Sequence, residues 1–351
     1  MTGSAPGVDR SSWRDVVSSY ARPDLGRSVL SLATSVVPLL GLWVLMYFAL
    51  DVSYLLVLVL TVPAAGFMLR SYILFHDCAH GSLLRGRRAN ARLGAVLGLM
   101  VATPFARWRN EHVLHHATAG DLDRRGSGDI RTLTVAEYDA RSWRSRLGYR
   151  LFRNPVVMFG LGPLWGMLLA PRWARPSAPR QIRRSVWGTN LALAAMIGGA
   201  IWLIGWRAFV LVDVPLVALA GAAGIWLFYV QHQFEHTYWQ HSSERSHADA
   251  ALRGSSYLRL PKVLQFFTGN IGLHHVHHLS TRIPNYKLQR AHDRESIFRD
   301  VPAISLWDGL RAVRLKLWDE DASRLVTWKE HRRGRSRSSG AVTSSDGAVA
   351  V

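Results

Sequence analysis

The sequence has a single cysteine among 351 residues, Cys78, so the chain cannot form an internal disulfide. It also lacks the groups of cysteine thiolates that hold structural zinc or iron–sulfur clusters. Acidic residues are scarce: 24 Asp and Glu stand against 43 Lys and Arg, and the net charge is +19. Long stretches carry no charge, and arginines flank them. This distribution indicates an integral membrane protein whose basic residues meet anionic lipid, and it argues against a nucleic-acid-binding protein.

Four apolar stretches are long enough to cross the hydrocarbon core of a bilayer as helices. They are residues 28–50, 52–75, 186–206 and 208–231. Short turns at Asp51 and Arg207 join them into two hairpins. Two further apolar stretches, 93–106 and 154–171, are short or rich in Pro and Gly, so we expect them to lie in the membrane interface. The sequence therefore predicts an all-α integral membrane protein with four transmembrane helices and a helical cytoplasmic cap.

The composition divides the chain into four expected parts. They are an N-terminal cytoplasmic segment (1–27), a membrane domain (28–290), C-terminal cytoplasmic helices (291–330) and a disordered tail (331–351). The first apolar stretch follows a mixed-charge segment and is too long for a signal peptide, so we expect no cleavable leader. The strongly positive loop at 171–184 is expected to stay in the cytoplasm of a bacterial cell.

Histidine is unusually concentrated in this apolar chain, which has 15 in total. Ten of them fall in four groups with helical spacing, so each group projects its rings from one face of a helix. The groups are HDCAH with His76 and His80, HVLHH with His112, His115 and His116, QHQFEH with His232 and His236, and HHVHH with His274, His277 and His278. Several imidazoles on one face are what a metal site requires.

All four groups can lie on one side of the membrane. The first group ends the first hairpin and the third follows the second hairpin, so two crossings separate them if the two short apolar stretches do not cross. Since the positive loop places this side in the cytoplasm, we expect the metal site and both termini there.

Isolated histidines usually lie at the surface or form hydrogen bonds, and we interpret four in that way: His241, His247, His292 and His331. The ten grouped imidazoles exceed the needs of one tetrahedral zinc ion, which favours two metal ions. Imidazole suits iron, copper, zinc or nickel, so the ligand type leaves the metal open. Four neighbours of the ligands are candidates for orienting ring N–H groups, although the acidic ones could equally be solvated charges. They are Asp77, Glu111, Glu235 and His275.

The histidine groups resemble the three histidine boxes of the membrane fatty acid desaturases. HDCAH at His76, HVLHH at His112 and HHVHH at His274 are similar to these boxes. The longer runs WRNEHVLHHATAGDLDRRGSGDIRTLTVAEY, FYVQHQFEHTYW and HHVHHLSTRIPNYKL are similar to the bacterial acyl-lipid, omega-6 (delta-12) branch. The resemblance covers about residues 28–290.

This resemblance implies an oxygen-dependent enzyme that introduces a cis double bond into a fatty acyl chain through a histidine-bound di-iron centre. It implies two iron ions, O2 as co-substrate, and all ten grouped histidines as candidate ligands. The least certain ligand position lies between the second and third boxes, where His232 or His236 matches. An acyl chain would reach the centre through an apolar tunnel. Four aromatic residues near the boxes are candidates for lining it, or else for core packing: Phe105, Trp108, Tyr238 and Trp239.

The sequence contains neither a Gly-rich dinucleotide fingerprint nor an HPGG-type haem-binding segment, so we expect a separate protein to supply the electrons. The basic surface favours an acidic donor such as a ferredoxin. A related membrane di-iron hydroxylase or carotenoid ketolase is the alternative enzyme, although IPNYKL and DLDRRGSGD favour a desaturase. A metal carrier is the non-enzyme alternative, but carriers place their ligands near the bilayer midplane, whereas these histidines follow helix ends.

Overall fold

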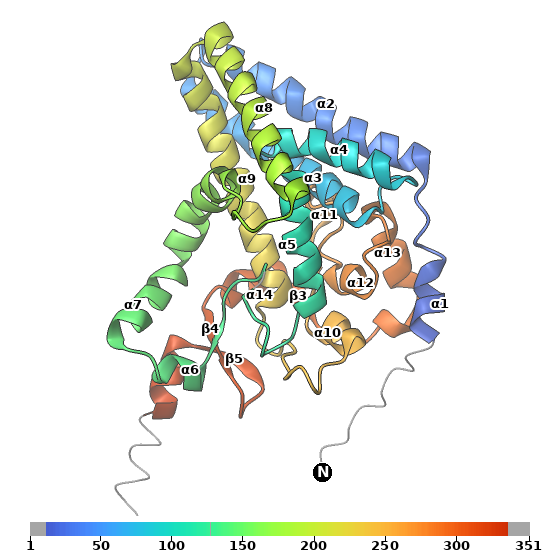
Figure 1. Ribbon diagram of the computed structural model, residues 1–351, viewed down its shortest axis with the longest axis vertical. Helices are drawn as coiled ribbons and strands as arrows, with labels where there is room; N and C mark the ends of the chain where they lie inside the picture. Colours follow the sequence, from blue (N-terminus) through green and yellow to red (C-terminus); the bar gives the residue numbers. More distant parts are fainter. Residues whose placement is uncertain (1–11, 127, 336–351) are drawn as a thin grey trace, which may run out of the picture.

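Among the residues that the structure describes, four long helices form the apolar part, seen in the upper half of Figure 1. The structure, a computed structural model, describes residues 12–126 and 128–335. The long helices are α2 (Leu25–Ala49), α3 (Tyr54–His80), α8 (Arg180–Ile204) and α9 (Trp206–His232). Each is long and apolar enough to cross a membrane by itself. The four transmembrane helices that the sequence predicts are therefore confirmed.

The second helix of the first hairpin is longer than the apolar stretch 52–75 and includes the first histidine group. α2 begins at Asp24, whose carboxylate accepts a hydrogen bond from the Arg27 amide at 2.8 Å. α3 begins after Ser53, which caps the Leu55 amide at 3.2 Å, and continues for 27 residues. It ends because Gly81 adopts the left-handed conformation, with φ of 72°. α3 packs against α2, α4 and α9 and is the central helix of the bundle.

The two short apolar stretches, 93–106 and 154–171, belong to bent helix pairs. α4 (Arg87–Met100) and α5 (Phe105–Thr118) meet at 104°, and α7 (Trp143–Phe152) meets the following helical turns at 59°. These turns are the π-helices η1 (Val157–Leu161) and η2 (Leu164–Leu169), followed by the 3₁₀ turn η3 (Ala170–Arg172). The two halves of each pair are long and apolar enough to cross a membrane only when taken together.

Short helices and two small sheets form a cap at one end of the bundle, in the lower half of Figure 1. The helices are α1 (Ser12–Ser18), α6 (Val135–Asp139), α10 (His247–Arg253), α11 (Lys262–Phe267), α12 (His274–Leu279), α13 (Asn285–Arg294), η4 (Ser296–Phe298) and α14 (Leu306–Ala312). Strand β4 (Leu315–Asp319) lies between β1 (Leu133–Thr134), which is parallel to it, and β5 (Arg324–Thr327), which is antiparallel. Strands β2 (Tyr257–Arg259) and β3 (Ala303–Ser305) pair in parallel.

The C-terminal part of the cap differs from the helices expected over residues 291–330. It contains η4 and α14, but β4 and β5 form a hairpin around the acidic turn Glu320–Ser323. The hairpin is favoured because apolar residues on both strands, including Leu317 and Leu325, are fully buried against the cap core. Residues 331–335 of the expected disordered tail are helical, and the rest of that tail lies outside the described residues.

Candidate metal centre

Nine of the ten grouped histidines converge where the membrane helices meet the cap. α3 supplies His76 and His80 from its last two turns, α5 supplies three residues, α9 supplies His232 from its end, and α12 supplies three more. Their side chains form two clusters, in each of which one ring nitrogen per residue lies within 4.8 Å of the others. Cluster 1 comprises His76, His80, His112, His116 and His277, and cluster 2 comprises His115, His232, His274 and His278.

The spacing within α5 and α12 divides their histidines between the clusters. His112 and His116, four residues apart, point into cluster 1, whereas His115 points into cluster 2. On α12, His274 and His278 point into cluster 2 and His277 into cluster 1. The two clusters are therefore adjacent, because each of these helices contributes to both. This arrangement can hold two metal ions side by side.

The ring nitrogens inside each cluster lie close enough together to bind the same metal ion. His116 Nε2 lies 3.1 Å from both His112 Nε2 and His277 Nε2. In cluster 2, His274 Nε2 lies 3.0 Å from His232 Nε2. Several more are buried without a hydrogen-bond partner, including Nε2 of His80, His115 and His278. Because a buried polar atom without a partner is costly, this donor set fits metal ions, which would satisfy these nitrogens together.

Burial and neighbouring rings favour the neutral form of five clustered imidazoles. Burial, followed by the neighbouring imidazoles, lowers the pKa of five cluster histidines on α5 and α12 well below its usual value. They are His112, His116, His274, His277 and His278. A neutral imidazole has a free lone pair on one nitrogen, which is the form that binds a metal.

Two acceptors outside the clusters orient histidines of cluster 2. Asp129 accepts a hydrogen bond from His115 Nδ1, and the carbonyl of Gly254 accepts one from His232 Nδ1 at 3.1 Å. In both cases the Nδ1–H is used, which leaves Nε2 free for a metal. The sequence reasoning missed Asp129. It lies 14 residues beyond His115, at the end of a loop that folds back on α5, where no helical spacing predicts a contact.

A glycine makes the return of this loop possible. Gly128 has φ of 78°, and a Cβ there would lie 2.8 Å from the Glu111 carbonyl oxygen. Only glycine fits so close an approach of the loop to α5 at this positive φ. Gly128 thus has a physical role: it lets the next residue, Asp129, reach His115.

Of the four residues predicted to orient the ligands, Asp77 contacts a clustered histidine. Its Oδ1 lies 3.3 Å from His76 Nδ1, and its Oδ2 accepts hydrogen bonds from the backbone and side-chain amides of Asn285, both at 2.8 Å. Asp77 is buried. It therefore links the end of α3 to the start of α13 beside cluster 1.

The structure does not bring His236 into either cluster. Its side chain is 77% exposed and lies beyond the end of α9. α9 ends at His232, so the four-residue spacing no longer places the two rings on one face. Of the possibilities for this position, His232, His236 or both, the structure places His232 in cluster 2 and leaves His236 outside both clusters.

Three other predicted orienting residues contact different partners. Glu111 is exposed and pairs with Arg107 at 3.0 Å, and Glu235 pairs with Arg324 at 3.0 Å. His275 is buried, but its Nε2 lies 3.0 Å from His292 Nδ1, away from both clusters. Glu111 and His275 each stand next to a clustered histidine on a helix, where successive residues are about 100° apart, and their side chains point away from that histidine.

A cavity of about 420 Å³ extends from the clusters into the membrane bundle. Its inner end reaches His76 and His112 of cluster 1 and His274 of cluster 2. Its walls come from α3, α5, α9 and the η2–η3 turns, and they include Met68, Leu69, Ile73, Met167, Ile225 and Leu227. The cavity walls are therefore mostly apolar, although Arg107, Glu111 and Gln231 also line the cavity, and the cavity reaches the metal centre.

Of the four aromatic residues predicted to line a tunnel, Trp108 lines this cavity. Its ring stacks on that of His112, with centroids 4.3 Å apart. Phe105 packs in the core against Phe75 instead. Tyr238 and Trp239 lie on the other side of cluster 2, beside a small pocket. The general expectation of an apolar tunnel fits the cavity, but three of the four residues do not line it.

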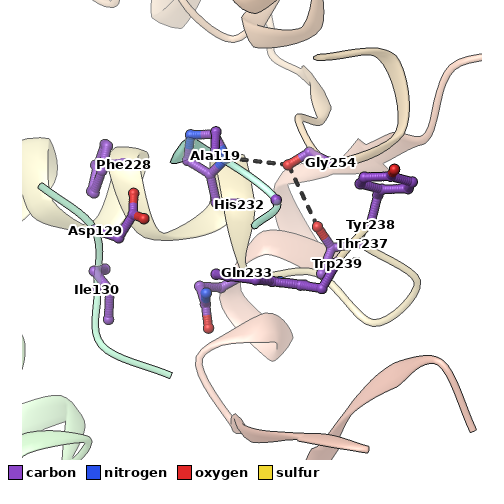
Figure 2. A pocket seen from close by; sticks show the side chains of 11 residues that line it. Ala119, Asp129, Ile130, Phe228, His232, Gln233, Thr237, Tyr238, Trp239 and Gly254 are labelled. Carbon is purple, nitrogen blue, oxygen red and sulfur yellow. Dashed lines mark hydrogen bonds between the residues drawn. The ribbon is translucent and has the colours of Figure 1, made fainter. Parts of the chain in front are cut away.

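Figure 2 shows this small pocket, which lies between the end of α9 and the loop carrying Asp129. His232 and Thr237 both contact the Gly254 carbonyl there, and Asp129 lies on the opposite wall. Its volume is about 10 Å³, which has room for about one water molecule. It is too small for a substrate, so the large cavity is the candidate substrate site.

Comparisons with known proteins agree with this arrangement. A family model described as "Fatty acid desaturase" matches residues 52–303. A Bacillus subtilis protein named "Fatty acid desaturase" is 45% identical over 313 residues, which is 89% of each chain.

More distant similarity extends to plants and cyanobacteria. The chloroplastic omega-6 fatty acid desaturase of Arabidopsis thaliana is 25% identical over 63% of this chain and 49% of its own length. The sn-1 acyl-lipid omega-3 desaturase (ferredoxin) of Synechocystis sp. is 26% identical, over 63% of this chain and 62% of its own. The chain thus spans about half the length of the plant relative.

Proposed function

The chain belongs to the fatty acid desaturase family and is an enzyme of that kind, and we propose that it introduces a cis double bond into an acyl chain of a membrane lipid, using two iron ions and O2. The overall reaction removes two hydrogen atoms from adjacent CH₂ groups. One O2 accepts them together with two electrons and two protons from outside, and two water molecules leave. Bound iron and O2 supply the oxidising power for the unactivated C–H bonds.

The observation that carries the proposal is the contact between the large cavity and both histidine clusters. The cavity walls reach cluster 1 through His76 and His112 and cluster 2 through His274. An acyl chain in this cavity would lie in an apolar, water-poor space beside the metal centre. Its position along the walls, set by packing, selects the carbons that react.

The nine clustered histidines would hold the two iron ions, five in cluster 1 and four in cluster 2. Asp129 and the Gly254 carbonyl fix the rings of His115 and His232, and Asp77 contacts His76. These outer partners act by orienting the ligands, because a ring held by its Nδ1–H can turn only its Nε2 to the metal.

Electrons would come from a separate acidic redox protein on the cytoplasmic side. The proposal is supported by the net charge of +19 and by exposed arginines near α12 and α13, such as Arg282, Arg290 and Arg294. One relative carries ferredoxin in its name. Cytoplasmic placement is supported by the positive loop before α8.

Expression in a bacterial host that lacks polyunsaturated lipids tests this function. We expect new double bonds in the extracted fatty acids, located by mass spectrometry. His277→Ala removes a cluster 1 ligand, so we expect the new products to fall at least about 100-fold and the iron content of the purified protein to drop.

His236→Ala is the matched control, because this exposed histidine lies outside both clusters. We expect it to retain product formation and iron content. Hydroxylated acyl chains or oxidised carotenoids in place of new double bonds would support the alternative enzymes. Full activity of His277→Ala would contradict the ligand assignment.

A further inference from the structure

We call the η2–η3 turns (residues 164–172) the portal segment, and we call its line of contact with α9 the seam. We propose that the acyl chain enters the large cavity sideways from the bilayer, through this seam. This inference rests on the proposed function, since it concerns how the lipid reaches that same cavity. In Figure 1 the green chain between α7 and α8 lies on the flank of α9.

The portal segment is a thin wall with two different faces. Trp165 and Leu169, four residues apart, are 63% and 47% exposed on its outer face. Its other face, including Met167 and Ala170, lines the cavity. Large apolar side chains exposed on a membrane helix face lipid. The portal segment, one helix thick, therefore separates the bilayer from the cavity.

The seam with α9 is built from small residues. Ala220, Gly221 and Gly224 of α9 line the cavity, and a Cβ at Gly221 would lie 2.7 Å from both Pro163 Cβ and Met167 Sδ. The contact at the seam is thus van der Waals contact between apolar atoms. Leu219, beside the seam, is 41% exposed. Parting such a contact in lipid breaks no hydrogen bond.

The far end of the portal segment is held much more firmly. Arg107 of α5 donates hydrogen bonds to the carbonyls of Ala170, at 2.5 Å, and Trp173. Arg172 donates to Asn190 of α8 at 2.9 Å and to the carbonyl of Ala102. One end is therefore held by side-chain hydrogen bonds, whereas at the other end Pro163, which directly precedes the portal segment, meets Gly221 through apolar atoms alone.

The backbone on both sides of Pro163 suits a local opening of this contact. η1 and η2 are π-helical, a conformation that is rare and less favourable than the α-helix. Gly160 and Gly166 have no atom within 4 Å of a Cβ position, so no neighbour restrains them there. A water-borne acyl carrier would need none of these features, whereas a lipid already lies against the outer face.

A reversible cross-link tests the motion. In the double variant Pro163→Cys, Gly221→Cys, the Cβ atoms need to move by about 1 Å to reach the spacing of a disulfide. The native Cys78 is buried, so mild oxidation should link only the introduced pair. We expect the oxidised enzyme, in membranes supplied with reduced ferredoxin, to desaturate at least about tenfold more slowly than after reduction with a thiol.

The matched control is Gly66→Cys, Phe267→Cys. A Cβ at Gly66 would lie 3.0 Å from Phe267 Cγ, so this disulfide pins α11 to α3 away from the cavity. We expect its oxidation to leave the rate unchanged. Since each enzyme is compared with its own reduced form, the added bulk of the cysteines cancels. An oxidised seam pair that works as fast as the reduced pair would overturn the proposal.

A second pair of variants covers the case in which the double cysteine variant does not fold. Gly166→Leu fills the cavity side of the portal segment, and Gly160→Leu adds the same side chain to η1, outside the cavity lining. We expect Gly166→Leu to slow desaturation about tenfold or more while Gly160→Leu stays within about twofold, both with wild-type iron content. Equal rates would contradict the portal, whereas a wild-type enzyme that forms no double bonds would contradict the proposed function instead.

Discussion

At the scale of single residues, the metal centre depends on how each imidazole is oriented. His115 illustrates this, because its Nδ1–H is held by Asp129 and its Nε2 is buried in cluster 2 without a partner. Asp129 also has a second oxygen that is buried without a hydrogen-bond partner. Burying a carboxylate costs free energy, and its hydrogen bond to His115 offsets part of that cost while it restrains the ring.

We therefore expect Asp129→Asn to weaken iron binding about 10- to 100-fold, because an amide holds the His115 ring less firmly than a carboxylate. Iron bound per protein at graded free iron measures this effect directly, apart from activity. Glu235→Gln is the control, since Glu235 is exposed and pairs with Arg324. If both variants bind iron like the wild type, Asp129 does not orient the ligand.

At the scale of elements, the ends of helices decide where the histidines lie. α3 carries its first histidine pair in its last two turns and stops at Gly81. The Gly81 amide bonds back to the Cys78 carbonyl at 3.1 Å, and the Ser82 amide bonds to the Asp77 carbonyl at 3.0 Å. This left-handed turn directs the chain away from cluster 1 toward α4.

Gly81→Ala should lower the free energy of unfolding by about 1–2 kcal/mol, because an L-residue with a Cβ is disfavoured at φ of 72°. Nothing lies within 4 Å of the new Cβ, so the cost is conformational and not steric. Thermal unfolding in detergent measures the difference. Gly148→Ala is the control, because Gly148 lies in the middle of α7, where alanine favours the helix more than glycine does. This change should leave the free energy of unfolding unchanged or raise it.

At the scale of the whole molecule, the cap locks the clusters onto the membrane bundle. Arg153, fully buried after α7, donates hydrogen bonds to Tyr229 and Gln233 at the end of α9 and to the Leu315 carbonyl of β4. It thus ties the C-terminal hairpin to the helix that carries His232.

The net charge of +19 is also a property of the whole molecule, and it would attract an acidic redox partner.

We expect the rate with an acidic ferredoxin to fall at least several-fold as salt rises from about 0.02 to 0.3 M, because added ions screen attraction between the proteins. Steady-state oxygen consumption at limiting ferredoxin measures this rate. A small neutral reductant such as a quinol serves as the control and should show little dependence on salt. A salt-independent rate with ferredoxin would argue against charge-guided docking.

The sequence alone determined the four membrane helices, the grouping of the histidines and the resemblance to the desaturases. These follow from local properties: uncharged length sets a span, and three- or four-residue spacing sets a helix face. Only the tertiary structure decided which histidines share a cluster, that His236 is exposed, that Asp129 reaches His115, and that residues 315–327 form a hairpin. Those outcomes depend on contacts between segments far apart in the chain, which packing fixes and local periodicity does not.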